Sequence, residues 1–289
     1  MQEIARAKVN LTLSILGRRP DGYHELDSLV AFAGIGDGIA FRPGEDPTVS
    51  VVGPFSGEIV GRNLVSVALE ACAVAEPRLT LGSVVIDKRL PVAAGLGGGS
   101  SDAAAVLRAV RAANPTYADG VDWTAIAARL GADVTVCFEN RPARMQGIGE
   151  RVRPLSRLPA VPAILVNPMV EVPADKTRNV YRALAAPPVS EVRSETSLPM
   201  FETAADVMAH AARATNDLEP PACAVVPAIA EVMAALSELP EVALVRLSGS
   251  GPTVFALFHD VPAATAAAEA LAVRHPHWWV VATAIGETA

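Results

Sequence analysis

A run of glycines constrains this chain more than any other feature. Four of the five residues from Gly95 to Gly99 are glycine, and the run separates an apolar segment from an alanine-rich one. Glycine allows a backbone with positive φ and lets a ligand approach the main chain without meeting a Cβ. Two serines and Asp102 follow, and these residue types begin helices. We therefore predict a strand, a tight loop and a helix over residues 103–113.

This loop has the features of an anion site. The first N–H groups of a helix lie at the positive end of its dipole and bind phosphate well. The stretch lacks the Gly-Lys-Ser/Thr ending of a P-loop, and it is not the G-x-G-x-x-G of a dinucleotide-binding unit. A flexible linker is the alternative, but linkers rarely lie between an apolar strand and a capped helix. Phosphate binding is the favoured hypothesis.

Size and charge limit the class of protein. The chain has 289 residues, of which 51% are hydrophobic and 19% are charged, and its formal net charge is −7. A net negative chain without clustered Lys and Arg argues against a nucleic-acid partner. No run approaches the roughly 18 apolar residues of a membrane span, and the N-terminus lacks an apolar signal segment. We therefore expect a cytoplasmic protein with no membrane partner.

The cysteine pattern suggests neither a disulfide framework nor a zinc site. The chain has three cysteines, which lie far apart at Cys72, Cys137 and Cys223. No Cys-x-x-Cys or His-paired spacing occurs. We expect buried thiols in a reducing compartment.

The N-terminal segment is predicted to be a strand. Residues 4–16 alternate between apolar and polar side chains, so one face is polar. Lys8 and Asn10 are two positions apart and project to the same side. An ordinary solvated face is the alternative, but small neighbouring side chains fit the wall of a cleft slightly better.

A turn at residues 20–22 precedes a second predicted strand, which begins at Tyr23 and His24 and reaches Phe32. Residues 34–61 are rich in glycine and proline and are expected to be irregular apart from short β segments at residues 39–41 and 49–52. Asn63 then opens a helix, and another helix over residues 123–130 ends at Gly131. Asp133 follows, as either a helix cap or an acid that accepts a hydroxyl proton.

The C-terminal half predicts a ferredoxin-like order of elements. A proline-containing segment near residue 159 is a plausible domain boundary. Beyond it, strands and helices follow in the order β-α-β-β-α-β, with two helices inserted after the first strand. The second glycine-rich turn, Ser248–Gly251, is a weak motif by itself. The expected strands are 163–167, 242–247, 253–258 and 278–284, and the expected helices are 174–184, 204–214, 222–239 and 263–273.

Three ordered stretches together resemble the GHMP small-molecule kinase family. They are AKVNLTLSILGRRPDGYHELDSLVAF, LPVAAGLGGGSSDAAA and LSGSGPTVFALF. The resemblance covers nearly the whole chain and implies an α+β, two-domain fold. It implies an N-terminal ATP-binding domain (residues 1–158) like domain 2 of ribosomal protein S5, and a C-terminal ferredoxin-like domain (residues 159–289).

The resemblance also implies roles for individual residues. Lys8 and Asp133 match the catalytic pair. The residues implied to bind the substrate are Asn10, Tyr23, His24, Thr177 and Tyr181. The residues implied to bind ATP are Asn63, Leu64, Lys88, Pro91, Ala94, Gly95, Leu96, Gly97, Gly98, Gly99, Ser100 and Ser101. Ser248, Gly249, Ser250 and Gly251 would form a supporting glycine loop.

The implied reaction is phosphorylation of a small molecule by ATP with Mg²⁺. The DGYHE segment implies an acceptor in which cytidine diphosphate is linked to methylerythritol, phosphorylated on its 2-hydroxyl, in the non-mevalonate route to isoprenoid precursors. Alternatives are another kinase of the family, of homoserine or mevalonate type, and a catalytically silent nucleotide-binding homologue. The metal ligands and the oligomeric state are left unassigned.

Overall fold

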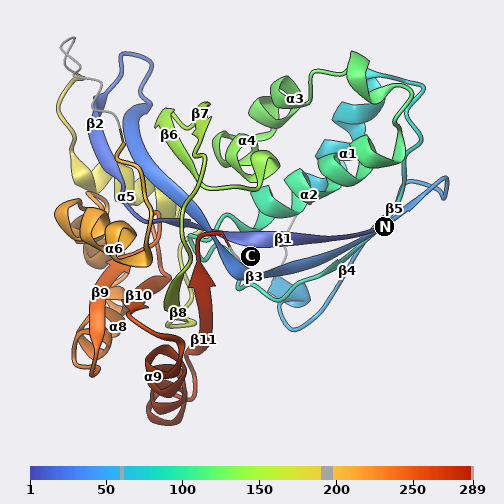
Figure 1. The fold of residues 1–289 in the computed structure, drawn as a ribbon. Helices are drawn as coiled ribbons and strands as arrows, with labels where there is room; N and C mark the ends of the chain where they lie inside the picture. The colour runs from blue at the N-terminus through green and yellow to red at the C-terminus, as the bar shows by residue number, and fades with distance from the viewer. Residues whose placement is uncertain (59–61, 190–197, 288–289) are drawn as a thin grey trace. The chain divides into compact units, whose positions relative to one another are not determined.

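The computed structural model (Figure 1) describes residues 1–58, 62–189 and 198–287. The chain divides into two compact units, each built from three separate segments. The first unit comprises Met1–Lys8, Ile35–Val92 and Gly97–Asn140, and the second comprises Val9–Gly34, Ala93–Leu96 and Arg141–Ala289. A functional division between residues 158 and 159 stays a prediction.

In the residues that the structure describes, the first unit combines strands with four packed α-helices. Helix α2 is the centre of the helical layer, because it packs on both α1 and α4 and nearly all of its apolar side chains are buried. Asn63 caps α1 by accepting from the N–H of Val65, as its position in the sequence predicts. The helices are α1 (Leu64–Ala75), α2 (Gly98–Ala113), α3 (Trp123–Leu130) and α4 (Ala132–Glu139), and the strands of this unit include β4 (Val49–Val52) and β5 (Gly82–Asp87).

Two further strands, β1 (Gln2–Asn10) and β3 (His24–Pro43), contribute residues to both units. The single strand expected over residues 4–16 is wrong, because the chain leaves β1 after Asn10 and resumes as β2 (Ser14–Arg18). In the break, Leu13 exchanges backbone hydrogen bonds with the segment around residue 216. The polar face of β1 is also not solvated, since Lys8 and Asn10 are both buried.

Strand β3 is much longer than the sequence predicts. It continues through the glycine-rich residues expected to be irregular and pairs with β5 from Gly38 to Pro43. Glycine suits this part of the strand, because a Cβ at Gly36 would lie 2.3 Å from the carbonyl oxygen of Ala5. The glycines here permit close strand contact rather than a loop.

The second unit contains the expected ferredoxin-like sheet. Its strand order is β11-β8-β10-β9, and all three pairings are antiparallel. Numbered within the β-α-β-β-α-β series, this is the order 4-1-3-2, which confirms the predicted arrangement. Helices α8 and α9 pack on this sheet. The strands are β8 (Val161–Asn167), β9 (Val242–Leu247), β10 (Val254–Phe258) and β11 (Trp279–Ile285).

The second unit contains further strands and helices besides this sheet. The first part of β3 pairs with β2 and with β6, and β6 pairs with β7. The helix expected over residues 222–239 is wrong as one element, because Pro227 lacks the N–H to continue it and separates α7 from α8. The elements are β6 (Ala143–Gly147), β7 (Arg151–Pro154), α5 (Lys176–Leu184), α6 (Ala204–Arg213), α7 (Glu219–Val225), α8 (Ala228–Ser237) and α9 (Val261–Arg274).

Among the described residues, no helix is both long and apolar enough to span a bilayer. Cys72 and Cys137 are buried as expected, whereas Cys223 is partly exposed.

Candidate active site

The glycine loop enters α2 without a capping side chain. The helix begins at Gly98, and Gly97 precedes it in the left-handed conformation with φ of 65°. The expectation that Ser100, Ser101 and Asp102 cap the helix is therefore wrong, since they lie inside its first turns. Within the described part of the chain, the backbone N–H groups from Gly95 to Ser100 donate no hydrogen bond. Such a series of free N–H groups at a helix start can hold an anion.

Space for a ligand is present at one position of the loop. A Cβ placed on Gly99 would meet no atom within 4 Å, and Gly99 is exposed. In contrast, a Cβ at Gly97 would lie 3.2 Å from the Cβ of Lys8. Gly97 therefore lets the loop pack directly on the lysine stem, and Gly99 leaves the main chain open to a phosphate group.

Lys8 and Asp133 meet, as the resemblance implies. The Nζ of Lys8 donates to Asp133 Oδ2 at 2.9 Å. The lysine side chain is 5% exposed and the aspartate side chain 35% exposed, so the carboxylate faces solvent from a buried cation. Asp133 lies in the first turn of α4, next to the positive end of the helix dipole. The pair presents a carboxylate that can accept a proton beside a fixed positive charge.

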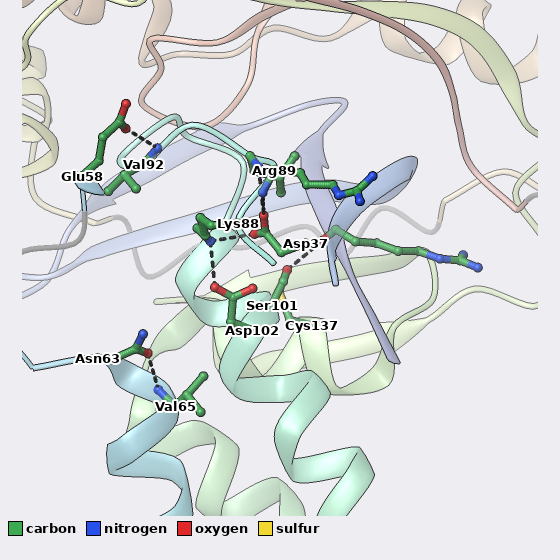
Figure 2. A network of polar contacts seen from close by, with 12 residues as sticks. Asp37, Glu58, Asn63, Val65, Lys88, Arg89, Val92, Ser101, Asp102 and Cys137 are labelled. Carbon is green, nitrogen blue, oxygen red and sulfur yellow. Dashed lines mark hydrogen bonds and ion pairs between the residues drawn. The ribbon is translucent and has the colours of Figure 1, made fainter. Parts of the chain in front are cut away.

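Lys88 lies beneath the loop rather than at its surface (Figure 2). Its ammonium donates to Asp37 Oδ2 at 2.6 Å and to Asp102 Oδ2 at 2.7 Å, and all three side chains are buried. A Cβ on Gly98 would lie 3.1 Å from this ammonium. Burial alone would lower the pKa of Lys88, but the two carboxylates raise it. The lysine therefore supports the loop from inside.

Asp37 is a residue that the sequence interpretation missed. Besides Lys88, its carboxylate accepts the backbone N–H groups of Arg89 and Leu90 at 2.6 and 2.8 Å. These bonds fix the segment that leads into the glycine loop (Figure 2). The sequence signal was faint, since Asp37 was one acid in a region expected to be irregular.

The other predicted ATP residues of the first unit differ in what their side chains do. The Ser101 hydroxyl is buried and donates to the carbonyl of Arg6 at 2.8 Å, so it anchors α2 to β1 (Figure 2). Asn63 and Leu64 lie at the start of α1. Ser100 is half-buried and Pro91 is buried. Their roles in binding ATP stay predictions.

The first part of the loop packs on the second glycine turn within the second unit. A Cβ at Gly95 would lie 2.6 Å from the carbonyl oxygen of Ser248 and 2.7 Å from that of Gly251. The Ser248 hydroxyl donates to the Gly95 carbonyl at 3.0 Å. Ala94 and Leu96, on either side, are buried. These contacts are those of a supporting turn.

A buried asparagine holds the supporting turn, and sequence reasoning missed it. The Asn216 amide donates to the carbonyls of Leu247 and Gly249 at 2.9 and 2.8 Å. Glu219 accepts the N–H of Leu247 at 3.1 Å. The sequence offered one signal for this contact, which is that Asn216 is followed closely by Asp217 and Glu219.

The predicted substrate residues all lie in the second unit. The rings of His24 and Tyr181 contact each other, with centroids 4.9 Å apart, and Tyr23, which precedes His24 in the sequence, is 61% exposed. The Thr177 and Ser250 hydroxyls are 3.1 Å apart. Asn10 donates to Ser28 at 2.8 Å, while its buried Oδ1 has no hydrogen-bond partner in the described residues.

The electrostatics of His24 suit recognition of a neutral ring. Burial, together with the charge of Arg18, lowers the pKa of His24, so the imidazole is neutral at neutral pH. A neutral imidazole has one donor and one acceptor nitrogen. Together with the contacting Tyr181 ring, this surface offers stacking and hydrogen bonds to a flat heterocycle.

No metal cluster accompanies these groups in the described residues, where no three or more His, Cys, Asp or Glu side chains could hold a metal ion together.

Two family models match this chain. The model for the N-terminal domain of GHMP kinases matches residues 63–140, and the model for the C-terminal domain of GHMP kinases matches residues 197–275. A relative that is 44% identical covers nearly the full chain, as given below. The chain belongs to the GHMP kinase family, whose members are small-molecule kinases that use ATP.

Within the family, several relatives and solved structures match over nearly the full chain. The chain is 44% identical over 289 residues to the 4-diphosphocytidyl-2-C-methyl-D-erythritol kinase of Rhodopseudomonas palustris, covering 97% of this chain and 95% of the relative. A crystal structure of 4-(cytidine 5'-diphospho)-2C-methyl-D-erythritol kinase matches with a TM-score of 0.77 and 37% identity, over 100% of both chains. A homoserine kinase from Cytophaga hutchinsonii has a TM-score of 0.71 but only 17% identity, covering 100% of this chain and 95% of the other, and shows the fold alone.

Proposed function

We propose that this protein transfers the γ-phosphoryl group of ATP to the 2-hydroxyl of 4-diphosphocytidyl-2-C-methyl-D-erythritol. The observation that carries the proposal is the Lys8–Asp133 pair, which lies in the same unit as the part of the glycine loop from Gly97 onward, where Gly99 leaves the main chain open. The full-length similarity to kinases with this acceptor in their names supports the substrate. The reaction belongs to the non-mevalonate route to isoprenoid precursors, and we place it in the cytoplasm.

The proposed chemistry needs one proton acceptor and fixed positive charge. Asp133 accepts the proton of the 2-hydroxyl group, and the oxygen of that hydroxyl forms a bond to the γ-phosphorus. The bond between that phosphorus and the β–γ bridging oxygen breaks, and ADP leaves. Lys8 orients the carboxylate and offsets negative charge on the transferred group. Positioning and charge stabilisation supply most of the catalysis in phosphoryl transfer.

The free N–H groups from Gly95 to Ser100 are proposed to hold the ATP phosphates, since they form a continuous series of donors without protein partners in the described residues. Asn63, Leu64 and Pro91 are proposed to line the nucleoside end. Mg²⁺ is proposed to accompany ATP. No cluster of the described residues fits the ion by itself, so we assign it no protein ligand.

The nucleobase end of the acceptor is proposed to lie on the second unit. His24, Tyr23 and Tyr181 would hold the cytosine ring, and Thr177 and Asn10 would contact the rest of the acceptor. The unpartnered Oδ1 of Asn10 supports this role, because a buried acceptor without a donor is costly unless a ligand supplies one.

The test is ADP release with Mg-ATP and the cytidyl acceptor. Wild type is compared with Asp133→Asn, which keeps the shape of the side chain but removes the proton acceptor. We expect kcat to fall at least 100-fold, because general base catalysis contributes about 10²–10⁴-fold. Asp122→Asn is the matched control, since Asn also caps helices and Asp122 caps α3. An Asp133→Asn enzyme with wild-type kcat would refute the assigned role.

Decoy acceptors and a second variant test the substrate. Homoserine and mevalonate should give no turnover, and His24→Ala should raise KM for the cytidyl acceptor about tenfold or more with a smaller change in kcat. The exposed His259→Ala is the control. Turnover with a decoy and none with the cytidyl compound would keep the family and reject the acceptor.

A further inference from the structure

The chain uses lysine sparingly and always in buried positions. Of its 24 basic residues other than histidine, only Lys8, Lys88 and Lys176 are lysine, and the rest are arginine. All three lysines are at most 4% exposed. Lysine carries a compact ammonium, whereas arginine carries a broad planar fork, so the two are not interchangeable at a confined site. Lys8 and Lys88 belong to the candidate active site, which leaves Lys176 without an assigned purpose.

Lys176 differs from the other two in its partners. It is the first residue of α5, and its ammonium donates to the carbonyl of Gly251 and, at 3.4 Å, to the carbonyl of Ala93. Within the described part of the chain it has no carboxylate at ion-pair distance. Burial alone lowers the pKa of Lys176 to about 8, and no charged side chain contributes to that shift.

The carbonyl of Ala93 is one of three consecutive carbonyls that are bonded into the second unit. Lys176 donates to Ala93, the N–H of Thr253 donates to Ala94 at 3.0 Å, and the Ser248 hydroxyl donates to Gly95 at 3.0 Å. In a trans peptide the N–H points away from the C=O. The three bonds therefore turn the N–H groups of residues 94–96 away from these donors.

The backbone at Ala93 requires such an anchor. Its φ of 54° lies in the left-handed region, which costs energy for a residue with a Cβ. Gly95 follows with φ of 79°. Positive φ angles at alternate residues, here Ala93 and Gly95, form a concave arrangement of backbone N–H groups that binds anions. Strained backbone conformations persist where surrounding contacts hold them. Lys176 is the charged group among the three donors that bond to the carbonyls of residues 93–95.

A buried ammonium without a carboxylate lowers the stability of the folded protein. A neutral side chain that packs equally well would avoid this loss. We propose that Lys176 is a positioning residue, whose ammonium ties the entry of the glycine loop at Ala93 to the turn at Gly251 and so presents the loop N–H groups to the phosphates of ATP. The proposal rests on the proposed function, because it takes ATP as the ligand of the loop.

The first test compares ATP affinity and thermal stability in three variants, by titration calorimetry without acceptor and by thermal melting. Lys176→Met keeps the length but removes the charge, and should bind ATP at least tenfold more weakly while its melting temperature stays at or above that of wild type. Lys176→Arg restores the charge and should recover part of the affinity. Arg182→Met, an exposed cation at the end of the same helix, should bind ATP as wild type does.

A purely structural lysine would give the opposite pattern, with a lower melting temperature and unchanged ATP affinity of the folded protein. That result overturns the proposal. Wild-type protein that binds ATP but does not turn over the cytidyl acceptor leaves it standing and rejects only the substrate. Wild-type protein that binds no ATP rejects both.

A second test needs no variant that might fail to fold. Protein labelled with ¹³C and ¹⁵N only in lysine gives three side-chain signals, so the titration of Lys176 can be followed directly. If the charged form presents the loop for ATP, then by linkage saturating ATP must raise the pKa of Lys176. A rise supports the proposal, and a midpoint that ATP does not move overturns it.

Discussion

The group of Lys88, Asp37 and Asp102 places two carboxylates on one ammonium in a buried position. Burial, with the charge of Asp37, raises the pKa of Asp102 to about 7 despite the opposing effect of Lys88. One oxygen of Asp102 has no hydrogen-bond partner in the described residues. Near neutral pH, Asp102 is therefore protonated in part of the folded protein, whereas in the unfolded chain it would have released this proton.

This proton makes stability depend on pH. Because the pKa of Asp102 is raised on folding, the folded state binds more protons than the unfolded state between about pH 4 and pH 7. Its contribution to the free energy of unfolding should fall as pH rises through that window. Asp102→Asn removes the titration, so the variant should gain stability relative to wild type as pH rises from 4 to 7.

Urea unfolding at several pH values measures this difference. Asp260→Asn is a suitable control, because Asp260 caps α9 from an exposed position where Asn caps equally well. Parallel stability curves for wild type and Asp102→Asn would contradict the assignment.

At the scale of single residues, the sequence indicated candidate catalytic and binding residues but not all of their contacts. Lys8 and Asp133 were found from motifs 125 positions apart, and their contact is as implied. Lys88 was assigned to the ATP-binding residues by resemblance, yet its ammonium is directed inward to Asp37 and Asp102. Ion pairs over such separations depend on packing, which no local pattern encodes.

The start of α2 is the element on which the proposed ATP site depends. Its first turn offers free N–H groups, and Gly99 is a position there where a Cβ meets no protein atom. Ala favours helices over Gly by about 1 kcal/mol. Gly99→Ala should therefore leave the melting temperature unchanged or higher while raising KM for ATP about tenfold or more, because the methyl group occupies space next to the phosphates.

Gly120→Ala is the matched control for this change. A Cβ at Gly120 also meets no atom within 4 Å, but Gly120 ends a short 3₁₀ helix outside the glycine loop. Steady-state kinetics with varied ATP should separate the two variants. Equal KM values for ATP would show that the space at Gly99 is not used.

Hydrophobic periodicity and the positions of glycine, proline and capping residues predicted most helices and strands. These predictions failed where tertiary contacts override the local conformational preference. Serines after a glycine run normally signal a helix cap, but here Gly97 in the left-handed conformation starts the helix earlier. Glycines near residue 36 normally signal a loop, but close pairing with Ala5 keeps them in β3. Pro227 was visible, and its break in the helix could have been predicted.

For the whole molecule, the composition of the two units predicts how fragments behave. The second unit includes the segment Val9–Gly34, and β6 pairs with residues 26–30 of that segment. A fragment of residues 159–289 alone would lack these strands and leave apolar surface uncovered. We expect neither this fragment nor residues 1–158 to unfold cooperatively when expressed separately, whereas the full chain should.

Circular dichroism during thermal and urea unfolding measures cooperativity, and the two fragments mixed together serve as the control for lost contacts. A sharp transition in the isolated C-terminal fragment would show that residues 9–34 are dispensable for its fold.

The three-segment construction also sets an order of events during synthesis. Ribosomes make the chain from its N-terminus, and domains begin to fold as they emerge. The first unit is complete once Asn140 has been made, but residues 9–34 are finished long before Arg141, where the main segment of their own unit starts. Strand β2 can pair with β3 inside this segment, but residues 26–30 must wait for β6 while the neighbouring unit folds. We therefore expect a chaperone to bind the growing chain at this segment.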